Sequence, residues 1–94
     1  MAQFTTRVEL HNATYNDYEV LHREMSRRGF SRTIREDGGD VYHLPQAEYD
    51  CSAATGKAAV LAAAQAAAAQ TGRGASILVT ESAGRTWSGL AKAT

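Results

Sequence analysis

The stretch FSRTIREDGGDVYHL, residues 30–44, decides the fold because it places a tight hairpin near the middle of the chain. Its centre, DGGD at residues 37–40, predicts the turn, since glycine accepts the positive φ angles that tight turns require. Phe30–Arg35 is expected to form the first strand of the hairpin, and Val41–Leu44 begins the return strand. The elements on either side of this hairpin then define the architecture.

A helix from Tyr15 to Arg28 is expected on the N-terminal side of the hairpin. A polar cap at Thr14 followed by Asp17 marks its start, because the helix dipole favours acidic side chains in the first turn. Apolar side chains then recur at helical spacing. Gly29 ends the helix, at a position where a left-handed residue is needed.

A second helix is expected on the C-terminal side, with Thr55 as its cap and Gly72 as its end. Nine alanines between Ala58 and Ala69 give this segment a high helix propensity and a slim profile. The helix can therefore lie close to a sheet. Its buried stripe is expected to comprise Val60, Leu61, Ala64, Ala67 and Ala68.

Strands are expected outside both helices. Phe4–Leu10 alternates apolar and polar side chains with the period of a strand that has one buried and one solvated face. Ser76–Glu81 supplies the last strand through Ile77 and Val79. The complete order is therefore strand, helix, strand, strand, helix, strand.

This order predicts an α+β fold, a ferredoxin-like βαββαβ two-layer sandwich. Its four-stranded antiparallel sheet would carry both helices on one face, in a single domain over residues 3–92. The third strand is central in such a sheet, so Pro45 fits this arrangement least well. That strand either ends at Pro45 or carries a bulge before Ala47–Tyr49.

The composition of the 94-residue chain excludes several classes of protein. Ten basic and ten acidic residues give no net charge, and 18 alanines outnumber the 15 Leu, Ile, Val and Phe residues, which indicates a thin core. The lone Cys51 excludes an intramolecular disulfide and cannot build a zinc site alone. With no apparent signal peptide or membrane-spanning stretch, we expect a cytoplasmic protein without metal or cofactor.

Arginines are concentrated where the first helix meets the second strand, and they supply eight of the ten basic residues. Guanidinium groups bind phosphate with two donors and stack on bases, so the bias favours RNA as a ligand. The alternative is that the helix-end arginines simply complement the helix dipole and face solvent. The candidate RNA-binding residues are Arg7, Arg23, Arg27, Arg28, Arg32 and Arg35.

Three histidines could titrate near neutral pH and serve in metal-independent RNA cleavage. His43 is expected on the open sheet face near Arg7 if the first and third strands pair. There it could deprotonate a ribose 2′-hydroxyl while a guanidinium stabilises the phosphorane. The alternative is a plain surface histidine. His22 is expected to be half-buried and structural. His11 is therefore the second candidate for proton transfer.

The segments FTTRVELHNATYNDYEVLHREMSRRGFSRTI, YHLPQAEY and ILVTESAGRTWSGL together resemble small bacterial proteins, the GhoS-type antitoxins of type V toxin-antitoxin systems. The resemblance covers most of the chain and lies in the order of elements and the general pattern. It implies a ferredoxin-like fold, akin to the small CRISPR-associated nuclease of the spacer-acquisition complex. It also implies an endoribonuclease that cuts the messenger RNA of a toxin.

Metal-dependent cleavage is not expected, because those CRISPR-associated nucleases carry a metal-binding aspartate at the end of the first strand. This chain has His11 and Asn12 there. No catalytic residue of the antitoxins is carried over to this sequence. The candidates for catalysis are therefore those that chemistry suggests, His43 and His11 for proton transfer and Arg28 for the phosphate.

The alternative function is a non-catalytic module of the same fold that binds RNA or a protein, including a second copy of itself. The thin core and the tail residue Trp87, which is expected to cover a core edge or a dimer contact, favour this hypothesis. A small-molecule sensor is a third, weaker alternative. No DNA or membrane partner is expected, and the aromatic signature of an RNA-recognition motif is absent from the expected central strands.

Overall fold

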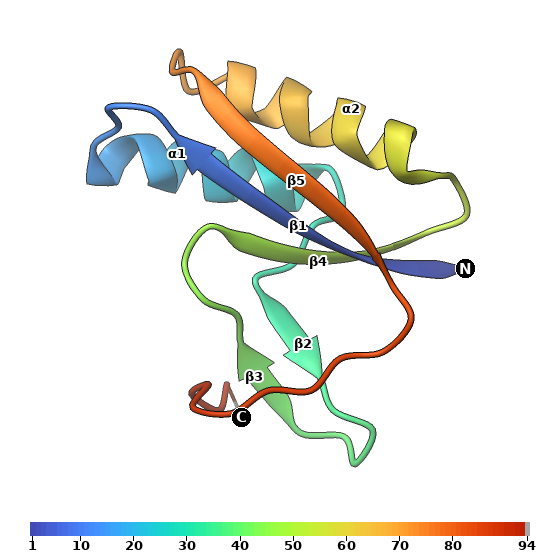
Figure 1. Cartoon of the computed structure of the whole chain (residues 1–94). Helices are drawn as coiled ribbons and strands as arrows, with labels where there is room; N and C mark the ends of the chain where they lie inside the picture. The colour runs from blue at the N-terminus through green and yellow to red at the C-terminus, as the bar shows by residue number, and fades with distance from the viewer. Residues whose placement is uncertain (94) are drawn as a thin grey trace.

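The order of elements in the computed structural model, which describes residues 1–93, confirms the α+β class (Figure 1). Two helices and five strands follow one another along the chain. Their bounds are β1 Ala2–Leu10, α1 Tyr15–Arg27, β2 Thr33–Arg35, β3 Val41–His43, β4 Glu48–Ala53, α2 Lys57–Ala69 and β5 Ala75–Ser82. The segment expected to form one third strand is thus divided into β3 and β4.

The strands form two antiparallel sheets, so the predicted single four-stranded sheet is wrong. One sheet has the order β4-β1-β5, and the hairpin β2-β3 forms the other. The division occurs at Pro45, whose carbonyl accepts the Glu48 N–H at 3.1 Å in a turn, and Ala47 there has a φ of 73°. A residue with this backbone conformation cannot continue a strand.

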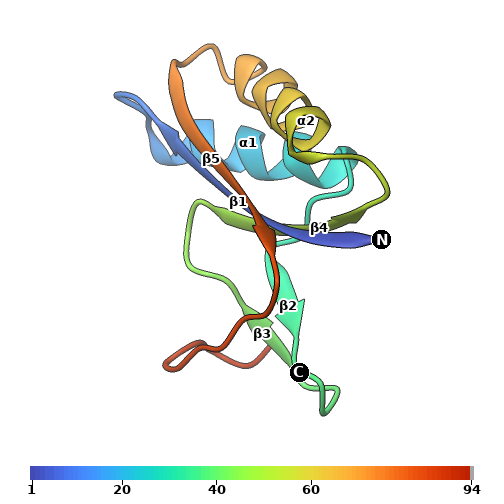
Figure 2. The same cartoon turned by 45° about the vertical axis from the view of Figure 1, so that its right-hand side comes forward.

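The hairpin extends away from the larger sheet in Figures 1 and 2. Only one bridge joins the chain just before β2 to β4, between Ser31 and Asp50. Its two backbone N–H···O bonds are 2.7 and 2.8 Å long. The hairpin is therefore a separate two-stranded sheet, bridged to the larger sheet at Ser31 and Asp50.

Both helices cover the same face of the three-stranded sheet, as predicted (Figure 2). The alternation in β1 places Phe4, Thr6, Val8 and Leu10 in the core, beneath Leu21 and Met25 of α1. From α2 the predicted stripe is buried at Val60, Ala64, Ala67 and Ala68, with Leu61 half-buried. The opposite face of this sheet is open and mostly polar.

Local signals explain how the helices begin and end. The Thr14 side chain accepts the Asp17 N–H while the Asp17 carboxylate accepts the Thr14 N–H, which confirms the predicted cap. Gly29, with a φ of 88°, follows α1. The cap predicted at Thr55 is wrong, because α2 begins after Gly56 with no side-chain cap and Thr55 lies one residue too early.

The tail after β5 returns to the hairpin. The His43 N–H donates to the Ala91 carbonyl at 2.9 Å, and the Ala93 N–H donates to the Val41 carbonyl at 2.8 Å. These bonds extend the small sheet on the β3 side. No helix within residues 1–93 is long and apolar enough to cross a bilayer.

Candidate nucleic-acid interface

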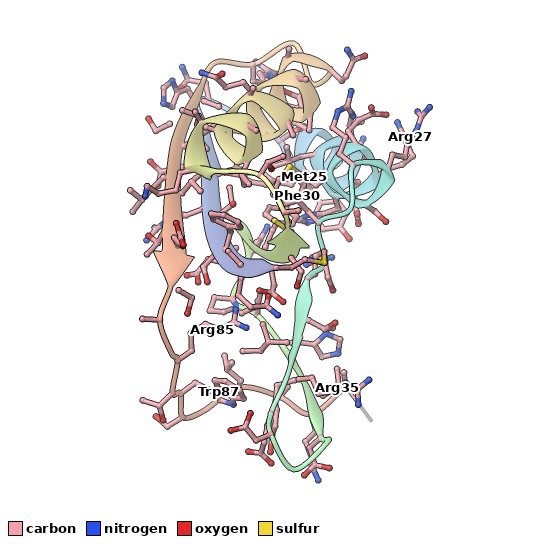
Figure 3. All side chains as sticks on the ribbon, turned by 90° about the vertical axis from the view of Figure 1, so that its right-hand side faces the viewer. Met25, Arg27, Phe30, Arg35, Arg85 and Trp87 are labelled. Atoms are coloured by element: carbon pink, nitrogen blue, oxygen red, sulfur yellow. The ribbon has the colours of Figure 1, made fainter. Side chains whose placement is uncertain are left out.

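Three of the candidate arginines surround one carboxylate on α1. The nearest nitrogens of Arg28, Arg27 and Arg23 lie 2.9, 3.2 and 4.0 Å from Glu24, whose residue surface is only 8% exposed. The hydrogen bond from Arg28 is the largest cause that lowers the pKa of Glu24. The cluster thus carries an excess of two positive charges, and Arg27 extends outward in Figure 3.

The other candidate arginines lie on different elements. Arg7 lies on the open face of β1, 3.9 Å from Glu9. Arg35 in the hairpin donates to the Gly39 carbonyl at 2.8 Å. Arg32 is exposed and forms no ion pair within the described part of the chain. The six predicted RNA-binding arginines are therefore distributed over β1, α1, the chain before β2 and the hairpin.

The three candidate catalytic residues are also separated. His11 follows β1 and its Nε2 lies 2.8 Å from Ser76 Oγ, whereas His43 belongs to β3 and Arg28 caps α1. The end of β1 and strand β3 lie at opposite ends of the molecule in Figures 1 and 2. The structure does not assemble these residues into one reactive centre.

The expectation that His43 lies beside Arg7 on the open sheet face is wrong. In the observed register Arg7 pairs with Glu48 of β4, and His43 pairs with Thr33 in the other sheet. The turn at Pro45 separates β3 from the sheet that contains β1.

A polar cleft of about 560 Å³ lies where the end of the larger sheet, the hairpin and the tail meet. Arg35 lines it from the hairpin, Gln3 from β1, and Arg85, Thr86 and Trp87 from the tail. In Figure 3 the labelled side chains of Arg35, Arg85 and Trp87 lie in this region, between the end of β5 and the hairpin turn. Two arginines and a tryptophan are thus among the residues that line the cleft.

Specific contacts hold these side chains in place. Arg85 Nη1 donates to Asp50 Oδ1 at 2.7 Å and to Thr5 Oγ1 at 3.4 Å, across the open face of the sheet. The ring of Trp87 packs edge-on against Tyr42, with centroids 5.6 Å apart. Because both groups are already oriented, little side-chain entropy remains to be lost when a ligand binds.

Sequence reasoning missed the contribution of Arg85 to this cleft. Arg85 and Trp87 lie 50 or more residues after Arg35, and no periodic pattern shows that the tail returns to the hairpin. The one available signal is the combination of a basic and an aromatic residue just after Gly84. Trp87 packs against Tyr42 of the hairpin, and the role expected for it at a dimer contact stays a prediction.

A second arrangement connects α1 with β4. His22 Nδ1 lies 2.6 Å from the hydroxyl of Tyr49, which is completely buried. Burial, followed by the positive charge of Arg32, lowers the pKa of His22, and burial raises that of Tyr49. The Ser31–Asp50 bridge sets Arg32 opposite Tyr49 in the antiparallel register. The half-buried position predicted for His22 is confirmed.

Two further kinds of site were compared with the geometry, a metal site and a nucleophilic thiol. Within residues 1–93 no three His, Cys, Asp or Glu side chains are grouped as metal ligands would be. Cys51 is a half-buried free thiol whose pKa is raised by burial. A raised pKa disfavours the thiolate, which is the nucleophilic form.

Searches against known proteins returned no relative. No family model, no curated protein and no solved structure matches this chain.

Proposed function

We propose that this protein is an RNA-binding protein of the GhoS antitoxin type, and that it holds a single-stranded segment of a toxin mRNA in the cleft. The observation that carries the proposal is the convergence of Arg35, Arg85 and Trp87 on one cavity of about 560 Å³. The resemblance of the three sequence segments to those antitoxins supports the choice of RNA as the ligand.

The chemistry of the cleft suits one or two unpaired nucleotides. Each guanidinium has five N–H donors, and the contacts with Gly39 and Asp50 leave others for phosphate oxygens. The indole offers a surface on which a base can stack. Glu36 and Asp37 also line the cleft, and the chain has no net charge, so attraction to nucleic acid in general is weak.

The ferredoxin-like fold is part of this proposal. The chain before β2 is bridged to β4, β4 pairs with β1, and β1 pairs with β5. These adjacencies support a ferredoxin-like sheet in which the outer part of the hairpin has separated at Pro45. We interpret the separation as the change that opens the cleft between the sheet and the hairpin.

Fluorescence anisotropy with a labelled single-stranded RNA tests the binding site. Removing a stacking aromatic costs about 1–3 kcal/mol per base, so Trp87→Ala should weaken binding about 5- to 150-fold. Arg35→Gln should also weaken binding. The matched control is Arg23→Gln, which removes the same charge from an exposed side chain of α1. Equal losses in the control and the cleft variants, with unchanged circular dichroism, would refute the cleft as the site.

Metal-independent cleavage of the bound RNA is the second candidate function. The observation in its favour is the 2.6 Å contact between His22 and buried Tyr49, which orients an imidazole near Arg32. His43, His11 and Arg28 remain proposed catalytic residues from the sequence. Incubation of the RNA with protein in EDTA should give discrete fragments ending in 2′,3′-cyclic phosphate, and His-to-Asn variants at positions 11, 22 and 43 identify the histidine required. Intact RNA would refute cleavage while leaving the binding proposal standing.

A further inference from the structure

The outer edge of β5 has no strand beside it. In the order β4-β1-β5 this strand is paired only with β1, over the whole of Ala75–Ser82. In Figures 1 and 2 α2 lies against the face of the sheet and leaves the edge of β5 open. Proteins usually protect such edges with lysine, proline or a bulge, and the sequence ASILVTES contains no lysine or proline.

Apolar surface accompanies this edge. Leu78 is 64% exposed on the open face, and within residues 1–93 only Met1 and Tyr15 are comparably exposed large hydrophobic residues. On the opposite face a shallow groove of about 360 Å³ lies between α2 and β5, lined by Leu61, Ala68 and Ile77. Both sides of the strand thus present apolar side chains next to unpaired backbone.

We propose that two copies of this chain pair through β5, antiparallel and around a two-fold axis at Leu78, to form a continuous six-stranded sheet. In this register Leu78 lies opposite the partner's Leu78 on the open face. Ile77 lies opposite the partner's Val79 beside the groove, and Ser76 lies opposite the partner's Thr80. Apolar residues meet apolar residues and hydroxyls meet hydroxyls, which stabilises cross-strand pairs.

Charge complementarity favours a second copy over an unrelated strand. Arg73 lies two residues before β5, and Glu81 lies near its end. Within the chain Arg73 Nε donates to Asp17 Oδ2 at 2.8 Å and Glu81 lies 3.6 Å from Lys57 Nζ, so a contact across the pair would use the Nη donors of Arg73. Antiparallel pairing at Leu78 places Ala75 directly opposite the partner's Glu81. Arg73 is two residues before Ala75, so it is the diagonal neighbour of that carboxylate. The two-fold axis repeats the contact at the other end. In a two-fold pair every favourable contact occurs twice.

Sedimentation equilibrium over a dilution series measures the predicted association. The wild-type protein should approach twice the chain mass of 10.1 kDa as its concentration rises. Leu78→Lys places like charges opposite each other and should raise the dimer dissociation constant more than about tenfold. Tyr15→Lys is the matched control, because it replaces another exposed large side chain, 74% exposed on α1, and should leave association unchanged.

Disulfide trapping tests the register. Side chains directly opposite in an antiparallel pair have Cβ atoms about 4.5–5.5 Å apart, near the range of a disulfide. With Cys51→Ser as background, Leu78→Cys should form a crosslinked dimer under mild oxidation. Thr80→Cys should crosslink far more slowly, because it lies opposite the partner's Ser76. A monomer at every concentration, or equal crosslinking at both positions, would overturn the proposal.

Discussion

Replacing Tyr49 with phenylalanine removes one hydroxyl from the junction between α1 and β4. The Tyr49 ring is fully buried and packs edge-on against Phe30, with centroids 6.5 Å apart, and phenylalanine preserves this packing. The change therefore isolates the 2.6 Å hydrogen bond with His22 Nδ1. A net hydrogen bond contributes about 0.5–1.5 kcal/mol, and leaving its half-buried partner unsatisfied adds to the loss. We expect Tyr49→Phe to lower the free energy of unfolding by about 1–2 kcal/mol.

Urea denaturation followed by far-ultraviolet circular dichroism measures this loss, provided that the slope of the transition is unchanged. Each kcal/mol should also lower Tm by about 4–8 °C in a domain of this size. Tyr15→Phe is the control, because Tyr15 is 74% exposed and its change should stay within about 0.5 kcal/mol. If Tyr49→Phe and Tyr15→Phe have the same stability, the hydrogen bond with His22 does not stabilise the fold.

Three further changes test other features of the fold. The pKa of His22 is lowered in the folded protein, so just below about pH 6.5 the unfolded chain binds more protons than the folded chain does. The free energy of unfolding should therefore fall as the pH drops from about 6.5 toward the folded pKa. In urea titrations at a series of pH values, His22→Gln should reduce this slope. The Thr6 hydroxyl is buried without a hydrogen-bond partner in the described chain. Thr6→Val should therefore raise the free energy of unfolding by about 1 kcal/mol, measured as a higher urea midpoint. Thr14→Ala removes the cap of α1 and should lower stability by about 1 kcal/mol, measured from the thermal transition.

The sequence predicted the elements whose signals are local. The alternation in Phe4–Leu10 places β1 correctly, with its apolar residues toward the helices. Thr14 and Gly29 define α1 within one residue, because a cap and a left-handed glycine act on the backbone next to them. The DGGD turn is also found where it was predicted, with the Gly39 N–H bonded to Glu36.

The arrangement of the sheets could not be predicted in the same way. Pro45 permits either a bulge or an end to the strand, and the choice depends on what the following residues pair with. Here Val8 donates its N–H to the Ala47 carbonyl, which holds the turned chain against β1. This contact joins residues 39 positions apart in the sequence, so no local pattern indicates it.

The candidate site depends even more on distant contacts. Arg35 was selected from its local cluster, but the cleft exists only because Arg85 and Trp87 return to the hairpin. The pairing of Tyr42 with Trp87 and of Asp50 with Arg85 determines that path. Conversely, the helix-end arginines form an obvious cluster in the sequence, yet Glu24 already binds three of them.

The central position of β1 also constrains how the chain folds. Its neighbours are Glu48–Ala53 and Ala75–Ser82, so β1 has no partner strand until α1, the hairpin and the turn at Pro45 have been synthesised. The only strands that can pair early are β2 and β3, which lie outside the larger sheet. Contacts so distant in sequence slow folding, because a long loop must close before they form. We therefore expect α1 and the hairpin to form first and β1 to enter the sheet late, leaving Phe4 and Val8 exposed to misassociation in the interval.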